Sequence, residues 1–297
     1  MANLKEVRNR IASVQSTQQI TKAMKMVSAA KLKRATNAII ALRPYATKLK
    51  EILGNLSASL EGSSSPFIQE REPNKVLIVT VSSNRGLAGA FNMNVIKAAN
   101  NLIAEKYSEQ LKNGNVSIIS IGKKTQDFYE KRKYNVIGNN NEIFSDLTFE
   151  NVTKITDAIM AGFVKGEFDK VEVVYNRFRN AAVQFITTEQ LLPLPKAEPV
   201  NETKVDKKTT NVDYILEPSQ EEIVEQLIPK SIKIQLYKAV LDSHASEHGA
   251  RMTSMDKATE NAGELLKALK LSYNQARQAA ITTELTEIVS GAAALNG

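Results

Sequence analysis

Three features of the sequence have residue types and spacings that could support chemistry, and the first is a pair of histidines. His244 and His248 flank Glu247 in a His-x-x-Glu-His arrangement, which one class of zinc metalloprotease uses. On a helix the two imidazoles would share one face, as two zinc ligands must. They are the only 2 histidines in the chain, however, and nothing nominates a carboxylate as third ligand. We therefore expect no metal site and interpret these histidines as solvated or interface side chains.

The second feature is the glycine-containing segment 82–90, which follows an apolar run and precedes a helical pattern. In nucleotide-binding α/β folds this position holds the phosphate loop. The spacing here is only Gly86-x-x-Gly89, without a third glycine and without a Gly-Lys-Ser/Thr ending. The segment therefore predicts a tight β-to-α turn in which the glycines allow close packing, and we expect no bound cofactor.

The third feature is a strongly basic N-terminal segment. Residues 1–60 contain eleven lysines and arginines but only Glu6 and Glu51, a net charge of +9, whereas the whole chain carries +7. Such a segment indicates an acidic partner, either nucleic acid or acidic protein, unless its charges simply face solvent. Base stacking would need aromatic side chains, and no aromatic residue precedes Tyr45. A basic coiled-coil nucleic-acid-binding protein is therefore kept as the alternative to an assembly role.

No other residues form a recognisable active site. The absence of cysteine excludes a disulfide framework, a thiolate nucleophile and a cysteine-based zinc site. The sequence offers no Ser-His-Asp arrangement and no carboxylate pair in an identifiable cleft. No apolar run approaches the roughly 20 residues that cross a bilayer, and the N-terminus lacks the apolar segment of a signal peptide. We expect a mechanical or assembly element rather than an enzyme, attached to a membrane only through partners.

Coiled-coil patterns at both ends predict the elements that carry these features. Apolar residues from Leu4 to Val14 follow a 3-4-3 spacing, polar Gln18 and Thr21 interrupt it, and a shifted pattern resumes through Leu56. The same spacing runs from Ala262 to Ala280. Because the two helices bracket one domain, we expect them to pair as an antiparallel coiled coil. The predicted division is an N-terminal helix over 1–60, a linker over 61–74 and a C-terminal helix over 218–297.

The central part of the chain alternates between strand and helix patterns. Strands are expected at 75–81, 116–121, 134–137, 171–175, 183–192 and 214–216, and helices at 93–111, 125–133 and 152–165. This order predicts a Rossmann-like, doubly wound α/β domain over 75–217, with a polar loop over 195–213. The fold class is therefore α/β plus coiled coil.

Four stretches of the chain resemble the gamma subunits of F-type ATP synthases of the bacterial type. They are residues 11–33, 84–92, 251–261 and 273–293, the last of which carries an Ile-Thr-x-Glu signature followed by Gly-Ala. The resemblance covers essentially the whole chain. It implies a non-catalytic rotor shaft inside a hexamer of alpha and beta subunits, with the α/β domain as a foot beside the epsilon subunit and the membrane c-ring. Proton flow through the ring would turn the shaft and drive the catalytic beta subunits.

The resemblance also implies roles for residues on the terminal helices. Four residues match family positions that contact a catch loop of the beta subunit: Arg277, Gln278, Thr282 and Glu284. Met24, Arg251 and Glu284 resemble a coupling cluster of the lower shaft.

Two further groups match positions that meet other partners in the family. Lys31, Lys33 and Arg34 lie where basic shaft residues face an acidic segment of beta, and Tyr214 and Glu217 match the foot segment near the ring. The absence of a transit peptide favours a bacterial complex, with this chain peripheral to the cytoplasmic face of the cell membrane.

Overall fold

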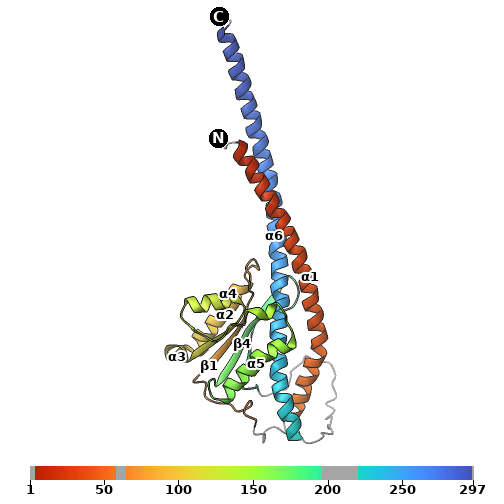
Figure 1. Ribbon diagram of the computed structural model, residues 1–297, viewed down its shortest axis with the longest axis vertical. Coiled ribbons are helices and arrows are strands. Elements are labelled where there is room, and N and C mark those ends of the chain that lie inside the picture. The colour runs from red at the N-terminus through yellow and green to blue at the C-terminus, as the bar shows by residue number, and fades with distance from the viewer. Residues whose placement is uncertain (1–3, 58–64, 196–219, 296–297) are drawn as a thin grey trace. The chain divides into compact units, whose positions relative to one another are not determined.

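The computed structural model describes residues 4–57, 65–195 and 220–295 (Figure 1). The chain divides into two compact units. Unit 1 combines the residues up to Ala30 with those from Arg251 onward, and unit 2 comprises Lys31–Ala250. The two longest helices, α1 (Leu4–Ser57) and α6 (Gln220–Leu295), contribute to both units.

Unit 2 is built on a five-stranded mixed sheet with the strand order β3-β2-β1-β4-β5. The strands are β1 (Val76–Val81), β2 (Val116–Ile121), β3 (Asn135–Val136), β4 (Lys170–Phe178) and β5 (Gln184–Leu192). β1 lies at the centre, pairs in parallel with β2 and β4, and has all of its residues buried. This burial explains why its sequence is a continuous apolar run rather than an alternating one.

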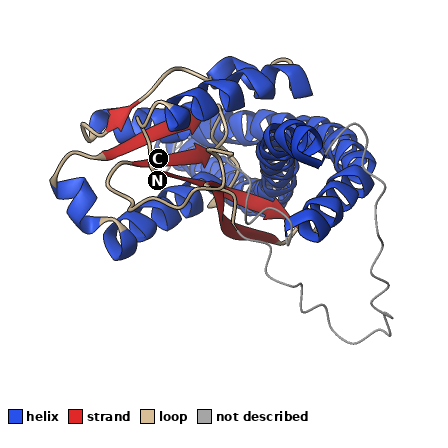
Figure 2. Cartoon of the chain, turned by 90° about the horizontal axis from the view of Figure 1, so that it is seen from below, coloured by secondary structure: helices blue, strands red, loops and turns tan. Residues whose placement is uncertain are grey.

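The helices between the strands lie on both faces of the sheet (Figure 2). The crossover helices are α2 (Phe91–Lys106), α4 (Lys123–Lys131) and α5 (Phe149–Val164), with short helices α3 (Ser108–Lys112) and η2 (Asn141–Phe144) beside them. Side chains of α2 and α4 pack on one face of β1, whereas α5 and α6 pack on the other. The predicted doubly wound α/β fold is confirmed.

Within unit 2 the two terminal helices also pack against each other. Ala35 and Ile39 of α1 are buried against Leu241 and Ala245 of α6. The small alanines allow the helices to approach closely. Tyr45 of α1 is 45% exposed, and the Lys230 ammonium lies 5.8 Å from its ring centroid.

In unit 1 the remaining parts of α1 and α6 form an antiparallel pair, as predicted. Its buried apolar side chains are Val7 on α1 and Met255, Ala262 and Leu266 on α6. Ala280 lies at the end of the predicted stripe and is still half-buried. This is a narrow apolar seam, and polar contacts supplement it.

All three helices predicted in the α/β domain differ in their bounds from those observed, and two of the differences coincide with specific hydrogen bonds. The expected helix over 93–111 is broken at Tyr107, whose backbone leaves helical geometry and whose buried hydroxyl donates to the Glu172 carboxylate. The helix expected from residue 152 begins at Phe149, because the Thr148 hydroxyl caps it by accepting from the Asn151 amide at 3.3 Å.

The strand expected at 214–216 lies outside the described residues, and so does almost all of the loop expected at 195–213. Among the described helices, none is both long and apolar enough to cross a membrane.

Candidate coupling surface on the terminal helices

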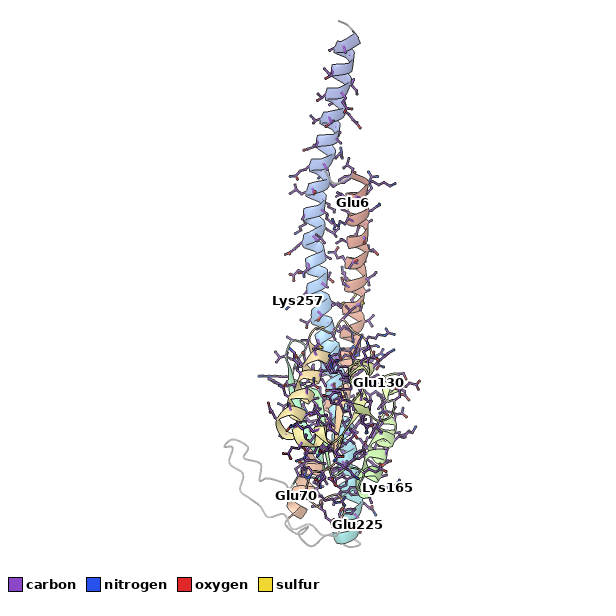
Figure 3. All side chains as sticks on the ribbon, turned by 90° about the vertical axis from the view of Figure 1, so that its left-hand side faces the viewer. Glu6, Glu70, Glu130, Lys165, Glu225 and Lys257 are labelled. Atoms are coloured by element: carbon purple, nitrogen blue, oxygen red, sulfur yellow. The ribbon has the colours of Figure 1, made fainter. Side chains whose placement is uncertain are left out.

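The C-terminal part of α6 is exposed over its whole circumference. Every residue from Ile281 to Ala294 is exposed, and side chains stand on all sides of this end of the helix (Figure 3). Four large apolar residues in this stretch are between 44% and 67% exposed: Ile281, Leu285, Ile288 and Val289. Their spacing places them along one side of the helix, where together they form an apolar stripe. An exposed stripe of this kind is a typical site for contact with another protein.

The residues expected to contact beta lie on or next to this stretch. Arg277, Gln278, Thr282 and Glu284 are all exposed. The Thr282 hydroxyl donates to the Gln278 carbonyl oxygen at 3.0 Å, one turn earlier. Each side chain is therefore accessible to a partner.

Met24, Arg251 and Glu284 do not form one compact cluster within this chain, and their coupling role stays a prediction. Arg251 and Glu284 lie on the same uninterrupted helix. At 1.5 Å per residue their separation is about 50 Å. Met24 is half-buried, Arg251 is 7% exposed and Glu284 is exposed, so their surroundings differ as well.

The basic residues Lys31, Lys33 and Arg34 lie on the part of α1 that belongs to unit 2, and all three are exposed. Their charges are therefore available to an acidic surface. Tyr214 and Glu217, the expected ring contacts, lie outside the described residues.

The two histidines are packed inside unit 2, so of the two expected alternatives, solvated or interface side chains, the solvated one is wrong for His248. His248 is only 5% exposed, and its Nε2 atom lies 3.2 Å from Nε2 of His244. The His244 ring stacks on Phe144 with a centroid distance of 5.8 Å. Within the described ranges, no group of three or more histidine, aspartate or glutamate side chains could hold a metal ion.

The turn after β1 is a tight connection between strand and helix, as expected, but Gly86 is not required there for close packing. A Cβ atom on Gly86 would meet only the Lys124 side chain, at 4.0 Å. Gly89 instead has φ of +57°, in the left-handed region that glycine adopts readily. The adjacent Leu87 also has positive φ, 63°. The Asn92 side chain stabilises the turn by accepting from the Ser83 amide at 3.0 Å.

Helix α6 covers the edge of the sheet at which ligands bind in related folds. In an open α/β sheet, that position is the crevice at the carboxyl ends of the strands where the strand order reverses, here between β1 and β4. The Ser243 hydroxyl donates to the Val81 carbonyl oxygen at 3.4 Å, and that of Ser246 donates to the Asn176 carbonyl oxygen at 2.9 Å. One backbone carbonyl oxygen of each strand is thus hydrogen-bonded to the helix.

Comparison with known proteins gives a consistent result over the whole chain. A family model described as ATP synthase matches residues 3–295. The gamma chain of ATP synthase from Cytophaga hutchinsonii is 56% identical over 297 residues, and that from Flavobacterium johnsoniae is 57% identical over 298 residues. In both comparisons the alignment covers 100% of each chain. The chain belongs to the ATP synthase gamma chain family. More distant gamma chains also match at full length, such as that of Chlorobium phaeobacteroides at 46% identity.

Solved structures of ATP synthases share the fold of this gamma chain family member. A chain in a Euglena gracilis mitochondrial ATP synthase structure of OSCP, F1 and c-ring has a TM-score of 0.64 and 19% identity, covering 98% of this chain and 94% of that one. A chain in a Tetrahymena thermophila mitochondrial ATP synthase structure of the central stalk and c-ring has a TM-score of 0.57 and 23% identity, covering 80% of this chain and 99% of that one. At these identities the similarity establishes the architecture of sheet and terminal helices.

Proposed function

We propose that this chain is the central rotor shaft of an F-type ATP synthase, which couples proton-driven rotation of a membrane ring to catalysis in beta subunits. The observation that carries the proposal is the exposed stretch of α6 from Ile281 to Ala294, an apolar helix end within a chain of this family. A single helix with an apolar surface is suited to turning inside a sleeve of partner subunits. Thr282 and Glu284, which match beta contacts, lie on this stretch, and Arg277 and Gln278 lie on the turn before it.

In this proposal the terminal helices over 1–60 and 218–297 form the shaft, and the α/β domain over 75–217 forms the foot. The shaft stands within a hexamer of alpha and beta subunits, and the foot meets the epsilon subunit and the c-ring. Exposed Lys31, Lys33 and Arg34 face an acidic segment of beta. Attraction between exposed charges is weak and screened by salt, so it would guide the shaft without trapping it at one angle.

The chain itself is proposed to be non-catalytic. Nucleotide chemistry belongs to the beta subunits, and the crevice that would bind a nucleotide in this fold is covered by Ser243 and Ser246 of α6. The proposed location is the cytoplasmic face of a bacterial membrane, with attachment through partner subunits only.

Co-purification tests the proposal directly. Solubilised membranes from the source cells should yield this chain together with alpha, beta, epsilon and ring subunits. The purified chain alone should hydrolyse no ATP, and it should be retained by an immobilised alpha–beta hexamer but not by duplex DNA at physiological salt. Retention on DNA without retention on the hexamer would favour the nucleic-acid alternative, and substantial ATP hydrolysis by the isolated chain would refute the non-catalytic role.

A further inference from the structure

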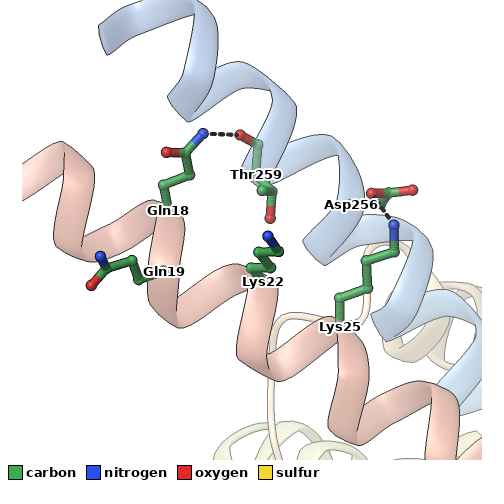
Figure 4. A pocket seen from close by; sticks show the side chains of 6 residues that line it. All are labelled: Gln18, Gln19, Lys22, Lys25, Asp256 and Thr259. Carbon is green, nitrogen blue, oxygen red and sulfur yellow. Dashed lines mark hydrogen bonds and ion pairs between the residues drawn. The ribbon is translucent and has the colours of Figure 1, made fainter.

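The centre of the helix pair in unit 1 is polar rather than apolar. Thr21 is only 8% exposed, and its hydroxyl oxygen lies 2.8 Å from that of Thr259 on the facing helix. Gln18, one turn before Thr21, donates from Nε2 to the Thr259 carbonyl oxygen at 3.4 Å (Figure 4). Gln18 and Thr21 interrupt the apolar pattern in the sequence, and in the structure both contact Thr259 on the facing helix.

The Thr21 and Thr259 hydroxyls link the two helices. The Thr21 hydroxyl donates to the Gln18 carbonyl oxygen at 3.0 Å and accepts from the Thr259 hydroxyl on the facing helix. The Met255 carbonyl oxygen lies 2.7 Å from the Thr259 hydroxyl and competes with Thr21 for the same proton.

Gly263 makes room for the amide of Gln18. A Cβ atom at position 263 would lie 3.0 Å from Gln18 Nε2, closer than ordinary van der Waals contact. The ion pair between Lys25 Nζ and Asp256 Oδ1, at 2.5 Å, continues the same antiparallel alignment. A cleft of about 340 Å³ lies beside these contacts, lined in part by Gln19 and Lys22.

We propose that Gln18, Thr21, Thr259 and Gly263, here called the polar clamp, set the antiparallel register of the terminal helices. The buried apolar side chains of unit 1 are few and include the small Ala262, so they discriminate weakly between registers. A slip of seven residues would keep the heptad spacing of a coiled coil. It would nevertheless separate the threonine hydroxyls and bring the Gln18 amide against a residue with a Cβ atom. Buried polar groups that lack a hydrogen-bond partner destabilise the folded state.

The register has a consequence for the proposed function. If the chain is a shaft, a fixed register holds the exposed end of α6 at one height relative to α1 and prevents the helices from sliding under load. This consequence rests on the proposed function. The register itself does not depend on the proposed function. It can be measured on the full-length chain without nucleotide or partner subunits.

Cysteine cross-linking tests the register, and the natural absence of cysteine makes the chain suitable for it. The reporter for the observed register is Arg8→Cys with Tyr273→Cys, since the tips of these two side chains are 2.9 Å apart. Both native side chains are longer than cysteine, and a direct disulfide needs Cβ atoms about 4 Å apart, so the two thiols are joined by a short bifunctional methanethiosulfonate reagent. Arg8→Cys with Ala280→Cys and Arg8→Cys with Leu266→Cys report slips of seven residues in either direction. Each pair is treated with the reagent in the full-length chain, and the cross-linked fraction is measured by non-reducing gel mobility.

The clamp is then made apolar by Gln18→Leu, Thr21→Val and Thr259→Val together. We expect the slipped pairs to cross-link at least about fivefold more than with the native clamp, while thermal stability is unchanged or higher, because both partners of each polar contact have been replaced. If these residues served stability alone, the triple substitution would instead lower the melting temperature of the chain and leave the register unchanged. Gln19→Leu is the matched control, since Gln19 lines the same cleft and should leave the register unchanged.

The cross-linked fractions of the slipped pairs decide whether the polar clamp sets the register. If the slipped pairs stay at the level of the native clamp while the Arg8–Tyr273 pair still forms, the register is set elsewhere and the proposal is wrong. If the triple variant fails to fold, Gly263→Ala carries the same prediction, because the added methyl group displaces the Gln18 amide. Loss of ATP synthase coupling in a complex would not affect the cross-linking result.

Discussion

Arg8 donates a hydrogen bond from Nη2 to the Tyr273 hydroxyl at 2.9 Å, and its guanidinium carbon lies 5.8 Å from the centroid of the same ring. The contact joins the first turns of α1 to α6. Beyond Ala280, the described residues of α6 are exposed on every side. Arg8 and Tyr273 therefore mark the place where the paired helices give way to a single one.

Tyr273→Phe should loosen this end of α1 without unfolding the chain. The substitution removes the hydrogen bond and keeps the ring beneath the guanidinium, so we expect amide hydrogen exchange over residues 4–11 to rise by about threefold. Tyr273→Leu removes both interactions and should raise exchange further. Equal exchange in the wild type and in both variants would show that the contact does not hold the helix end.

Tyr107→Phe should destabilise the α/β domain. Burial, followed by the hydrogen bond to Glu172, raises the pKa of Tyr107, so its hydroxyl remains protonated and donates to a carboxylate that is 3% exposed. Removing the donor leaves a buried carboxylate with Lys170 Nζ at 3.9 Å as a weak partner. The expected loss is about 1.5 to 3 kcal/mol in the free energy of unfolding, measured by urea denaturation.

Tyr134→Phe is the control for this experiment. Tyr134 packs edge-on against Tyr129 at a centroid distance of 5.2 Å, as part of the cluster that contains Tyr107. Its substitution should cost less than about 0.5 kcal/mol, as is usual where no buried hydrogen bond is lost. An equal loss in the two variants would mean that packing, and not the bond to Glu172, accounts for the effect.

Asp242→Asn should stabilise the chain in a pH-dependent way. Asp242 is 4% exposed, and burial raises its pKa from 3.8 to about 6, with Glu189 acting in the same direction and Lys238, Arg43 and Arg177 opposing it. Between these pKa values the folded state binds more protons than the unfolded state, so this carboxyl makes stability fall as pH rises from about 4 to about 6. Above pH 6 the loss of folding free energy caused by burying the ionised Asp242 carboxylate is constant, of the order of 2 to 3 kcal/mol.

The difference between the Asp242→Asn variant and the wild type isolates this group from all others. Urea denaturation at pH 4, 5, 6 and 7.5 should show a variant advantage that is smallest at pH 4 and largest at pH 7.5. A difference that does not change across this range would mean that Asp242 has the same pKa in the folded and unfolded states.

The sequence predicts an element of this fold well where the residues that determine the element are close together in the chain. The central strands β1 and β2 could be placed almost to the residue because each is a short, apolar, β-branched run between turn residues. The break at Tyr107 could not, since it depends on Glu172, which is 65 positions away in the chain. The burial of His248 was missed for the same reason, because its i, i+4 spacing to His244 says nothing about which elements cover a helix face.

The candidate coupling residues illustrate a different limit. Arg277 and Gln278 are exposed polar residues like their neighbours, so neither burial nor spacing distinguishes them. Only the resemblance to gamma subunits nominated them. It also grouped Arg251 with Glu284, which a single long helix holds far apart. Family motifs identify positions, but the structure of the chain decides which of them can act together.

Neutralising the basic residues of α1 should reduce the salt dependence of ATP hydrolysis by the assembled complex. The variant Lys31→Gln, Lys33→Gln, Arg34→Gln removes three exposed charges that are proposed to face an acidic segment of beta. Since exposed charge pairs are screened by salt, turnover of the variant should change less between about 50 and 300 mM salt than that of the wild type. The triple variant Lys97→Gln, Lys106→Gln, Lys112→Gln changes the net charge equally at exposed sites on α2 and α3 and should behave as the wild type. Identical salt profiles for all three proteins would contradict the proposed contact.

Arg277→Ala and Gln278→Ala should lower ATP synthesis by the assembled complex while leaving the chain folded. Both side chains are exposed, and neither is part of a buried cluster, so each substitution should change the free energy of unfolding by less than about 0.5 kcal/mol. If Arg277 and Gln278 hydrogen-bond to beta during rotation, the loss of one such hydrogen bond should slow turnover by about tenfold. Assembly of the complex should be unaffected. Gln275→Ala is the matched control, because Gln275 is exposed on the same turn of α6 and matches no proposed contact. Turnover equal to that of the control in both variants would exclude these two residues from the coupling surface, whereas loss of assembly would place them in binding rather than in coupling.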